Sequence, residues 1–334
     1  MIYIRVDVND TIATGHLMRC LAIADAASIL GDAATFLLAD GQGEDLVRAR
    51  GHHAIVLHTK WNDMQAELPA LFKVIKEHHV TRLLIDSYQV TKEYLGQLKP
   101  QVQTFYIDDV NAFLYPVHAV ICYANYWKRF QYQEHYKDAS LYLGTAYIPL
   151  REAYSNCEEK VIKPEVEHIL LLSGGTDPFD VMENLLAQIN REHYKQITVI
   201  CGRYYDHYHA LCAKYAAEQN VRILQNVSDI ECHMKKADLA VSAGGATLYE
   251  LCAVGTPAIS YSFADNQLGN VTKFEEDHLI DYAGDARQGS VTEHIVRYLE
   301  YYHHNQGLRR ERSRNMQKLV DGKGALRIAG LLIE

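Results

Sequence analysis

Apolar runs of strand length alternate with longer amphipathic stretches through the first half of the sequence. The runs stand at 2–8, 34–39, 54–58, 82–86 and 103–107. Stretches of helical length and pattern lie between them, at 16–30, 43–50, 64–78 and 92–98. Strands that alternate with helices in this way predict a parallel sheet with right-handed crossover connections.

The alternation pauses at residues 156–165, which mix charges and include Pro164, and this favours a domain boundary there. It resumes with strand-like runs at 168–172, 197–201, 221–224, 238–242 and 258–263 and helical stretches at 206–218, 229–236 and 246–254, and the chain is mostly helical from 291. We therefore expect an α/β protein with two Rossmann-like doubly wound domains, residues 1–155 and 165–334, that face a central cleft. The length of 334 residues suits two domains.

Composition narrows the class of protein. Hydrophobic residues make up 48% and charged residues 22%, as in ordinary globular proteins, and no apolar run approaches the ~18 residues of a membrane helix. The net charge of -9 argues against a nucleic-acid partner, which would require a basic face. Seven cysteines without a C-x-x-C motif indicate reduced thiols. Because the N-terminal segment has the pattern of a strand instead of a signal peptide, we expect a cytoplasmic protein without nucleic-acid or membrane partners.

A stripe of arginines occupies the helical region near the end of the sequence. Its members share a short helical stretch and are Arg309, Arg310, Arg312 and Arg314. Such a stripe is typical of a solvated helix face, and we interpret it in this way.

A glycine turn at Gly244 and Gly245 separates the predicted strand 238–242 from the helix that follows. Two glycines let the backbone approach a ligand closely, and the first amide groups of a helix favour a phosphate. Glu250, one turn into this helix, is placed to accept hydrogen bonds from a ribose. Alternatively, Thr247 and Glu250 form a capping box, S/T-x-x-E, without any ligand. The pattern leaves both interpretations open.

A second candidate site lies at the start of the helix predicted from His16. His16 and Arg19 share one face of this helix, directly after the first strand, where open parallel sheets bind ligands. Histidine has an unperturbed pKa of about 6.5, and the positive end of a helix favours its neutral form, so His16 is a candidate general base. Alternatively, this histidine only forms a hydrogen bond with the loop.

Two segments resemble one family of nucleotide-sugar enzymes. They are RVDVNDTIATGHLMRCLAIAD, which begins at Arg5, and AGGATLYELCAVGTPAI with the ADNQ that follows it. Both are similar to the UDP-sugar hydrolases of pseudaminic acid biosynthesis and their spore-coat-polysaccharide relatives. That family has the two-domain glycosyltransferase B fold and is related to the murein N-acetylglucosaminyltransferase. The resemblance implies that His16 activates a water molecule against the anomeric carbon of the sugar. Ala13 stands where the family usually has a glycine.

Further motifs extend the resemblance. The sequence Asp86-Ser87-Tyr88 is similar to the family's Asp-His-Tyr, which implies that Tyr88 lies against the sugar. The glycine loop after the strand 168–172 resembles the family's Phe-Gly-Gly-x-Asp-Pro, which implies contact with the diphosphate. Asp108 also matches a family motif, but we expect it to cap the turn that follows its strand.

The resemblance implies the residues of the site and their roles. His16 is the catalytic base. Sugar contacts are expected from Arg5, Asp7, Gly15, Arg19, Asp86, Tyr88, Asn125 and Tyr147. UDP contacts are expected from Gly174, Gly175, Ser242, Gly244, Gly245, Ala246, Thr247, Glu250, Asp265, Asn266 and Gln267. We expect no metal or other cofactor, because no cluster of His, Asp or Glu has the spacing of metal ligands.

The implied reaction is hydrolysis of a UDP-sugar. Water would attack the anomeric carbon with inversion and release UDP and a free 2,4-diacetamido-2,4,6-trideoxy hexose, for the biosynthesis of pseudaminic-type acids or surface polysaccharides. Two alternatives stay open: a glycosyltransferase of the same fold that passes the sugar to an acceptor, and a nucleotide-sugar-binding protein without catalytic activity. The sequence does not predict the oligomeric state.

Overall fold

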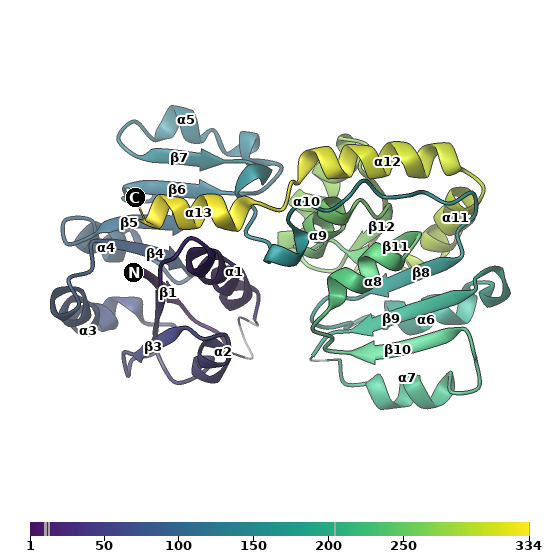
Figure 1. The fold of residues 1–334 in the computed structure, drawn as a ribbon, viewed down its shortest axis with the longest axis horizontal. Helices are drawn as coiled ribbons and strands as arrows, with labels where there is room; N and C mark the ends of the chain where they lie inside the picture. Colours follow the sequence, from purple (N-terminus) through teal and green to yellow (C-terminus); the bar gives the residue numbers. More distant parts are fainter. Residues whose placement is uncertain (10–11, 13, 204, 334) are drawn as a thin grey trace. The chain divides into compact units, whose positions relative to one another are not determined.

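Two parallel β-sheets flanked by helices form the core of the protein in the computed structural model (Figure 1). The structure describes residues 1–9, 12, 14–203 and 205–333. Their contacts divide them into two units, the first of residues 1–155 and 322–334 and the second of residues 156–321. The expected fold class, two Rossmann-like α/β domains, is confirmed.

The first unit is built on a sheet of seven parallel strands within the described residues. In spatial order these are β3 (His53–Val56), β2 (Ala34–Leu38), β1 (Ile2–Val6), β4 (Arg82–Asp86), β5 (Gln103–Ile107), β6 (Ala119–Cys122) and β7 (Ser140–Leu143). Its helices are α1 (Gly15–Ile29), α2 (Glu44–Ala49), α3 (Met64–Glu77), α4 (Lys92–Leu98), α5 (Tyr132–His135) and α13 (Gly324–Ile333), with short 3-10 turns η1 (Trp127–Phe130), η2 (Thr145–Tyr147) and η3 (Glu152–Tyr154). The strand order reverses direction between β1 and β4, and such a reversal opens a crevice at the carboxyl ends of the two strands.

The second unit repeats this plan with six parallel strands in the part of the chain that the structure describes. Their order is β10 (Val221–Gln225), β9 (Gln196–Cys201), β8 (His168–Leu172), β11 (Leu239–Ala243), β12 (Ala258–Ser262) and β13 (Ile280–Asp285). Its helices are α6 (Val181–Gln188), η4 (Arg191–His193), α7 (Tyr208–Lys214), α8 (Ile230–Lys236), α9 (Thr247–Val254), α10 (Asp265–Glu276), α11 (Thr292–His303) and α12 (Gln306–Leu319). Here the reversal lies between β8 and β11.

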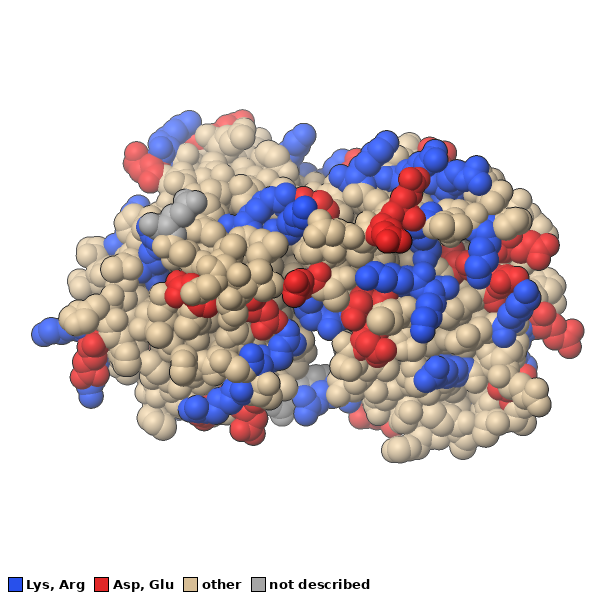
Figure 2. Space-filling model, viewed as in Figure 1, with Lys and Arg blue, Asp and Glu red and all other residues tan. Residues whose placement is uncertain are grey.

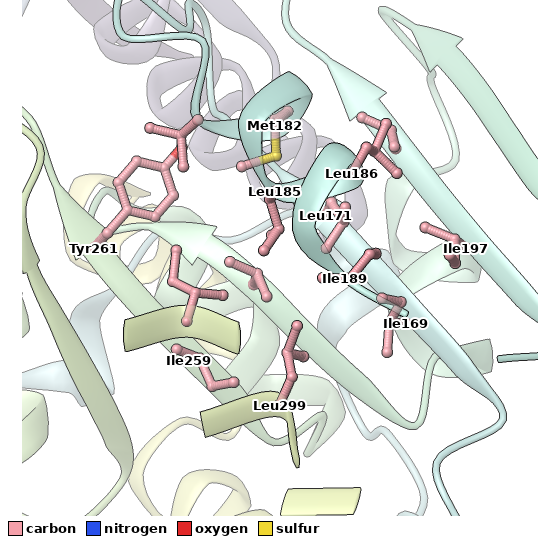
Figure 3. Packing of buried hydrophobic residues seen from close by; sticks show 14 of the residues in the cluster. Ile169, Leu171, Met182, Leu185, Leu186, Ile189, Ile197, Ile259, Tyr261 and Leu299 are labelled. Atoms are coloured by element: carbon pink, nitrogen blue, oxygen red, sulfur yellow. The ribbon is translucent and has the colours of Figure 1, made fainter. Parts of the chain in front are cut away.

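Parallel strands that are buried on both faces account for the continuous apolar runs of the sequence. Every residue of β8, β11 and β12 is buried. Ile169 and Leu171 of β8 pack in one cluster with Leu185 of α6 and Ile259 of β12 (Figure 3). Complete burial of one such side chain contributes roughly 1.5–3 kcal/mol. This cluster therefore holds the helices against the sheet of the second unit.

The last helix, α13, belongs to the first unit, whereas we expected the second domain to extend to residue 334. It packs against α1, and its residues Ile328, Ala329 and Leu332 are buried. The pattern of this helix predicts an apolar face, but it carries no information about which sheet that face covers. No helix among the described residues is both long and apolar enough to cross a membrane.

The charged segment 156–165 lies along α12 of the second unit. Arg309 of α12 is fully buried, and its guanidinium donates to the carbonyl oxygens of Lys163 at 3.1 Å and Pro164 at 2.6 Å. Arg312 is buried as well. The interpretation of the arginine stripe as a solvated helix face is therefore wrong for Arg309 and Arg312. Over the region of α12, Figure 2 shows acidic side chains among the basic ones.

The chain leaves the first unit after Ser155 and returns to it at Gly322, and these two residues are in contact. Ser155 Oγ donates to the carbonyl oxygen of Gly322 at 2.7 Å. Gly322 has a φ of 71°, and a Cβ atom added here would lie 2.1 Å from the carbonyl oxygen of Tyr154. Both the left-handed backbone and the close approach require glycine.

We predict that Gly322→Ala destabilises the protein more than the left-handed conformation alone explains. That conformation costs an L-residue roughly 1–2 kcal/mol. The displacement of the Tyr154 backbone adds roughly 1–3 kcal/mol, as other overpacking substitutions do. The measurement is the midpoint of urea unfolding.

Gly31→Ala is the matched control for this prediction. Gly31 follows α1 with a φ of 85°, and nothing lies within 4 Å of a Cβ added there. This variant carries the backbone strain without the steric clash. Equal losses of stability in the two variants would contradict the prediction.

A buried histidine predicts a loss of stability in acid. His168 begins β8, and its Nε2 lies 2.9 Å from Thr198 Oγ1. Burial lowers the pKa of His168 in the folded chain. As the pH falls below about 6.5, the unfolded chain therefore takes up a proton before the folded chain does, and this contribution to stability is lost. We expect His168→Gln to lose stability less steeply than the unmodified protein between about pH 7 and 5, whereas His209→Gln, at an exposed position on α7, should follow the unmodified protein.

Candidate active site

The reversal point of the first sheet brings His16 and Asp86 together. His16 is the second residue of α1, which follows β1, and Asp86 is the last residue of β4. His16 Nδ1 lies 2.6 Å from Asp86 Oδ1. A proton on Nδ1 lets this nitrogen donate to the carboxylate, and in that tautomer of the neutral imidazole the lone pair is on Nε2. This geometry can position an imidazole as a general base.

Arg19 keeps Asp86 ionised. One turn after His16, its guanidinium donates from Nε to Asp86 Oδ2 and from Nη2 to Asp86 Oδ1, both at 2.5 Å. Burial would raise the pKa of Asp86, whose side chain is only 1% exposed, but the charge of Arg19 and the hydrogen bonds from Arg19 and His16 more than offset this and hold the pKa well below its usual range. Asp86 is therefore an anion at any physiological pH. We infer that it orients His16 through this hydrogen bond.

Two residues that we did not predict complete this cluster. Arg19 Nη1 donates to Asp109 Oδ2 at 2.9 Å and forms a short hydrogen bond with the hydroxyl of Tyr123, and its guanidinium also stacks on the Tyr123 ring, 5.4 Å from the centroid. Asp109 follows β5 and Tyr123 follows β6. The Asp-Asp pair at the end of the 103–107 run was a signal for Asp109, whereas β6 was not predicted and Tyr123 could not be placed.

Tyr88 lies against His16, in the loop after β4. The two rings meet edge to face, with 4.5 Å between their centroids. Tyr88 is 43% exposed, so its outer face remains open to a ligand beside the imidazole. Its neighbour Ser87 is buried and accepts a hydrogen bond from the backbone of Gln89, which turns this side chain into the loop.

Arg5 and Asp7, both predicted to contact the sugar, are buried and form ion pairs within the first unit. Arg5 is fully buried, and it pairs with Glu67 of α3 at 2.5 Å and with Asp7 at 2.7 Å. Asp7 also accepts from the backbone of Ala39. This network ties the end of β1 to α3. Glu67 was missed, although a glutamate within the apolar stripe of the predicted helix 64–78 was a signal for a buried ion pair.

The remaining predictions for the first unit have mixed outcomes. Asp108 caps its turn as expected, because Oδ1 accepts from the backbone of Val110 and Asn111. Asn125 lies half-buried in the loop after β6. Tyr147 of η2 packs against Tyr142 of β7, and η2 lies against α13. None of the described contacts of Tyr147 joins it to His16. Gly15 opens α1 with nothing within 4 Å of an added Cβ, and Ala13 lies outside the described residues.

The second unit places two glycine turns at its own reversal point, after β8 and after β11. Gly174 and Gly175 are exposed, and Gly174 has a φ of 82°. They rest on Gly202, after β9, where an added Cβ would lie 2.1 Å from the carbonyl oxygen of Gly174. Gly202 was not predicted. A glycine directly after the strand 197–201 was its only signal.

The turn after β11 differs from the prediction in its details. Gly244 permits close packing of α10, because an added Cβ would lie 2.2 Å from Val271. The amides of Gly244 and Gly245 donate to backbone carbonyl oxygens, so the amides that α9 can offer to an anion begin at Ala246 and Thr247. Ala246 is the N-cap and its side chain makes no capping bond, so the capping box with Thr247 as N-cap is wrong.

The polar residues around this turn are partly engaged in the fold. Ser242 is buried and its hydroxyl donates to the carbonyl oxygen of Ala243. Gln267 Oε1 accepts from the backbone of Phe263. Asp265 is exposed and pairs with Arg287 at 2.7 Å. The exposed Asn266 and the half-buried Glu250 also lie at this edge of the sheet, at the start of α10 and one turn into α9.

Each unit offers one feature that a catalytic site could use. The first unit offers an oriented imidazole beside an exposed aromatic ring. The second offers two glycine turns at the carboxyl edge of a parallel sheet, where the start of α9 can bind an anion. Within the described residues, no group of three or more His, Cys, Asp or Glu side chains is arranged to hold a metal ion.

Comparisons with known proteins agree with this organisation. Residues 169–318 match the glycosyltransferase family 28 C-terminal domain. The spore coat polysaccharide biosynthesis protein SpsG of Bacillus subtilis is 26% identical over 198 residues, which cover 58% of this chain and 58% of that protein. The UDP-N-acetylglucosamine--N-acetylmuramyl-(pentapeptide) pyrophosphoryl-undecaprenol N-acetylglucosamine transferase of Helicobacter pylori is 31% identical over 153 residues, 43% of this chain and 42% of that protein. The chain thus spans less than two thirds of each relative.

Solved structures are similar over almost the whole chain. MurG of Acinetobacter baumannii superposes with a TM-score of 0.71 at 13% identity and covers 100% of this chain and 99% of that one. The spinosyn rhamnosyltransferase SpnG gives a TM-score of 0.65 at 12% identity, with 99% and 100% covered. At these identities the likeness shows the fold alone. The chain thus has the two-domain glycosyltransferase B fold, and its second unit carries the match to the C-terminal domain of glycosyltransferase family 28.

Proposed function

We propose that the protein hydrolyses a UDP-sugar, with the second unit binding UDP and the first unit supplying the base. The observation that carries this proposal is the ion-paired arrangement of His16, Asp86 and Arg19 at the reversal point of the first sheet. An imidazole with one nitrogen bound to a buried carboxylate has its other nitrogen available to accept a proton. A protein that only bound a nucleotide-sugar, without turnover, would not require this arrangement.

The reaction needs little from the protein beyond the base and the positioning of the substrate. His16 Nε2 takes a proton from water as the water oxygen forms a bond to C1 of the sugar. The bond between C1 and the phosphate oxygen breaks, its electron pair stays on that oxygen, and UDP leaves. Attack on the face opposite to UDP inverts the anomeric centre. Tyr88, whose ring stands beside His16, is placed to pack against the sugar.

The choice of UDP is supported by the relatives. The Helicobacter pylori transferase is named for UDP-N-acetylglucosamine, and it matches this chain at 31% identity. We propose that the glycine turns and the start of α9 bind the diphosphate, that Glu250 binds the ribose, and that Asn266 and the Gln267 amide contact the nucleotide. A 2,4-diacetamido-2,4,6-trideoxy hexose, for nonulosonic acid or surface polysaccharide biosynthesis, is the sugar that the sequence resemblance favours.

A glycosyltransferase is the second candidate. The matched relatives include named transferases, and the loops after β4 and β5 expose the apolar side chains of Tyr88, Val110 and Leu114. An acceptor with an apolar part could contact these side chains. In that case His16 would take the proton of an acceptor hydroxyl in place of water.

The two candidates differ in what happens without an acceptor. We expect the purified protein, incubated with the UDP-2,4-diacetamido-2,4,6-trideoxy hexose alone, to release UDP and a free sugar whose first-formed anomer is inverted. Proton NMR of the anomeric signals measures both products. UDP release that begins only after an acceptor is added would establish the transferase in place of the hydrolase.

Substitution of His16 tests the base directly. His16→Asn should lower kcat by about 10²–10⁴, because the proton acceptor is lost. The affinity for UDP should not change, because His16 belongs to the first unit and UDP binding is assigned to the second. Turnover follows from UDP release, and affinity from calorimetric titration.

His53→Asn provides the control. His53 is an exposed histidine on β3 in the same unit, and it does not belong to the Asp86 cluster. The control variant should retain the kcat of the unmodified protein. If His16→Asn also retains it, His16 is not the base.

A further inference from the structure

Arg203 is held next to the glycine turn of the second unit. It follows Gly202, and Gly202 is in such close contact with the turn that an added Cβ would lie 2.1 Å from Gly174 O and 2.3 Å from Gly175 O. Gln225 fixes this loop from β10, because its Nε2 donates to the carbonyl oxygens of Gly202 and Tyr205, each at 3.2 Å. The contacts of Gly202 therefore place Arg203 beside the turn that is assigned to the diphosphate.

Arg203 is a cation without a partner among the described residues at this edge of the sheet. Among the described residues of the loops after the six strands, the arginines and lysines are Arg203 and Arg287. Arg287 is neutralised by Asp285 and Asp265, both at 2.7 Å. Arg203 is exposed, and within the described part of the chain no hydrogen bond, ion pair or ring contact engages it.

The same edge carries several carboxylates. Asp177, Asp180, Asp206 and Asp229 stand in the loops after β8, β9 and β10. His207 pairs with one of them, Asp180, at 3.0 Å. A diphosphate at the glycine turns would meet this negative field, and helix-terminal amides alone offer only about half a charge against it. A guanidinium beside the glycine turns would supply the positive charge that the helix terminus lacks.

Two buried hydroxyls belong to residues of the loops after β8 and β9. Ser173, the residue before Gly174, is fully buried, and Tyr205 in the Arg203 loop is 5% exposed. Neither Ser173 Oγ nor the Tyr205 hydroxyl has a hydrogen-bond partner within the described structure. Buried polar groups are normally satisfied, so both loops have a hydroxyl that can bind a polar ligand atom or water.

We propose that Arg203 binds the diphosphate of the nucleotide-sugar and is the principal side-chain determinant of affinity for it. The planar guanidinium can donate two parallel hydrogen bonds to phosphate oxygens, which a lysine cannot reproduce. The inference rests on the proposed function, because it takes the ligand to be a UDP-sugar. It adds a residue that neither the resemblance nor the glycine turns identify.

The test compares the binding of UDP and of uridine by calorimetric titration and competition. Arg203→Gln should weaken UDP binding roughly tenfold or more, as loss of a charge-assisted contact does. Uridine binding should not change, because uridine has no phosphate. Arg203→Lys should restore only part of the affinity for UDP. Arg310→Gln, at an exposed arginine on α12 of the same unit, should bind both ligands like the unmodified protein.

Each outcome of these titrations supports or overturns the inference about Arg203. Unchanged UDP affinity in Arg203→Gln overturns the inference and leaves the proposed function intact, and an equal loss for uridine and UDP overturns it as well, because a phosphate contact cannot act on the nucleoside. Selective weakening of UDP supports the inference even if no UDP-sugar is hydrolysed, in which case only the hydrolase proposal fails. If the unmodified protein binds no UDP, both fail.

Discussion

The first-sheet site depends on one buried carboxylate that must stay charged. Desolvation opposes the ionisation of Asp86, and the charge of Arg19 opposes this effect and favours the carboxylate that accepts from His16. Arg19 is itself fixed by Asp109 and Tyr123, which follow two further strands. The orientation of one imidazole therefore depends on β1, β4, β5 and β6 together, so the proposed base is held in place only when this part of the sheet has formed.

The second unit uses contact between loops where the first uses charge. Gly202 supports Gly174, and Gly244 admits Val271 of α10, so both glycine turns are set by neighbouring backbone or side chains. Rigid turns of this kind can present amide groups to a ligand without further ordering. The two units thus share a topology, but they stabilise their reversal points by different physical means.

Much of this organisation could be predicted from the sequence, because hydrophobic periodicity reports burial. Most predicted strands coincide with observed ones to within one or two residues, and the positions of His16, Tyr88 and the glycine turns at strand ends follow from the parallel topology. It is harder to predict whether a side chain at the end of a strand points into the fold or toward a ligand. Arg5 and Ser242 stand at such ends yet point into the fold, where Glu67 and the carbonyl oxygen of Ala243 bind them. Pairs like Arg5 with Glu67 are separated by 62 residues, and no local pattern connects them.

The return of the chain to the first unit at Gly322 has a consequence for biosynthesis. The second unit is a continuous segment, residues 156–321, inserted between two parts of the first. During translation, the second unit can fold as soon as its own residues have left the ribosome. The first unit, although most of it is made earlier, must keep the surface of α1 that α13 covers exposed until residues 324–333 emerge. All residues of the proposed nucleotide-binding unit are therefore available for folding before those of the unit that carries the proposed base.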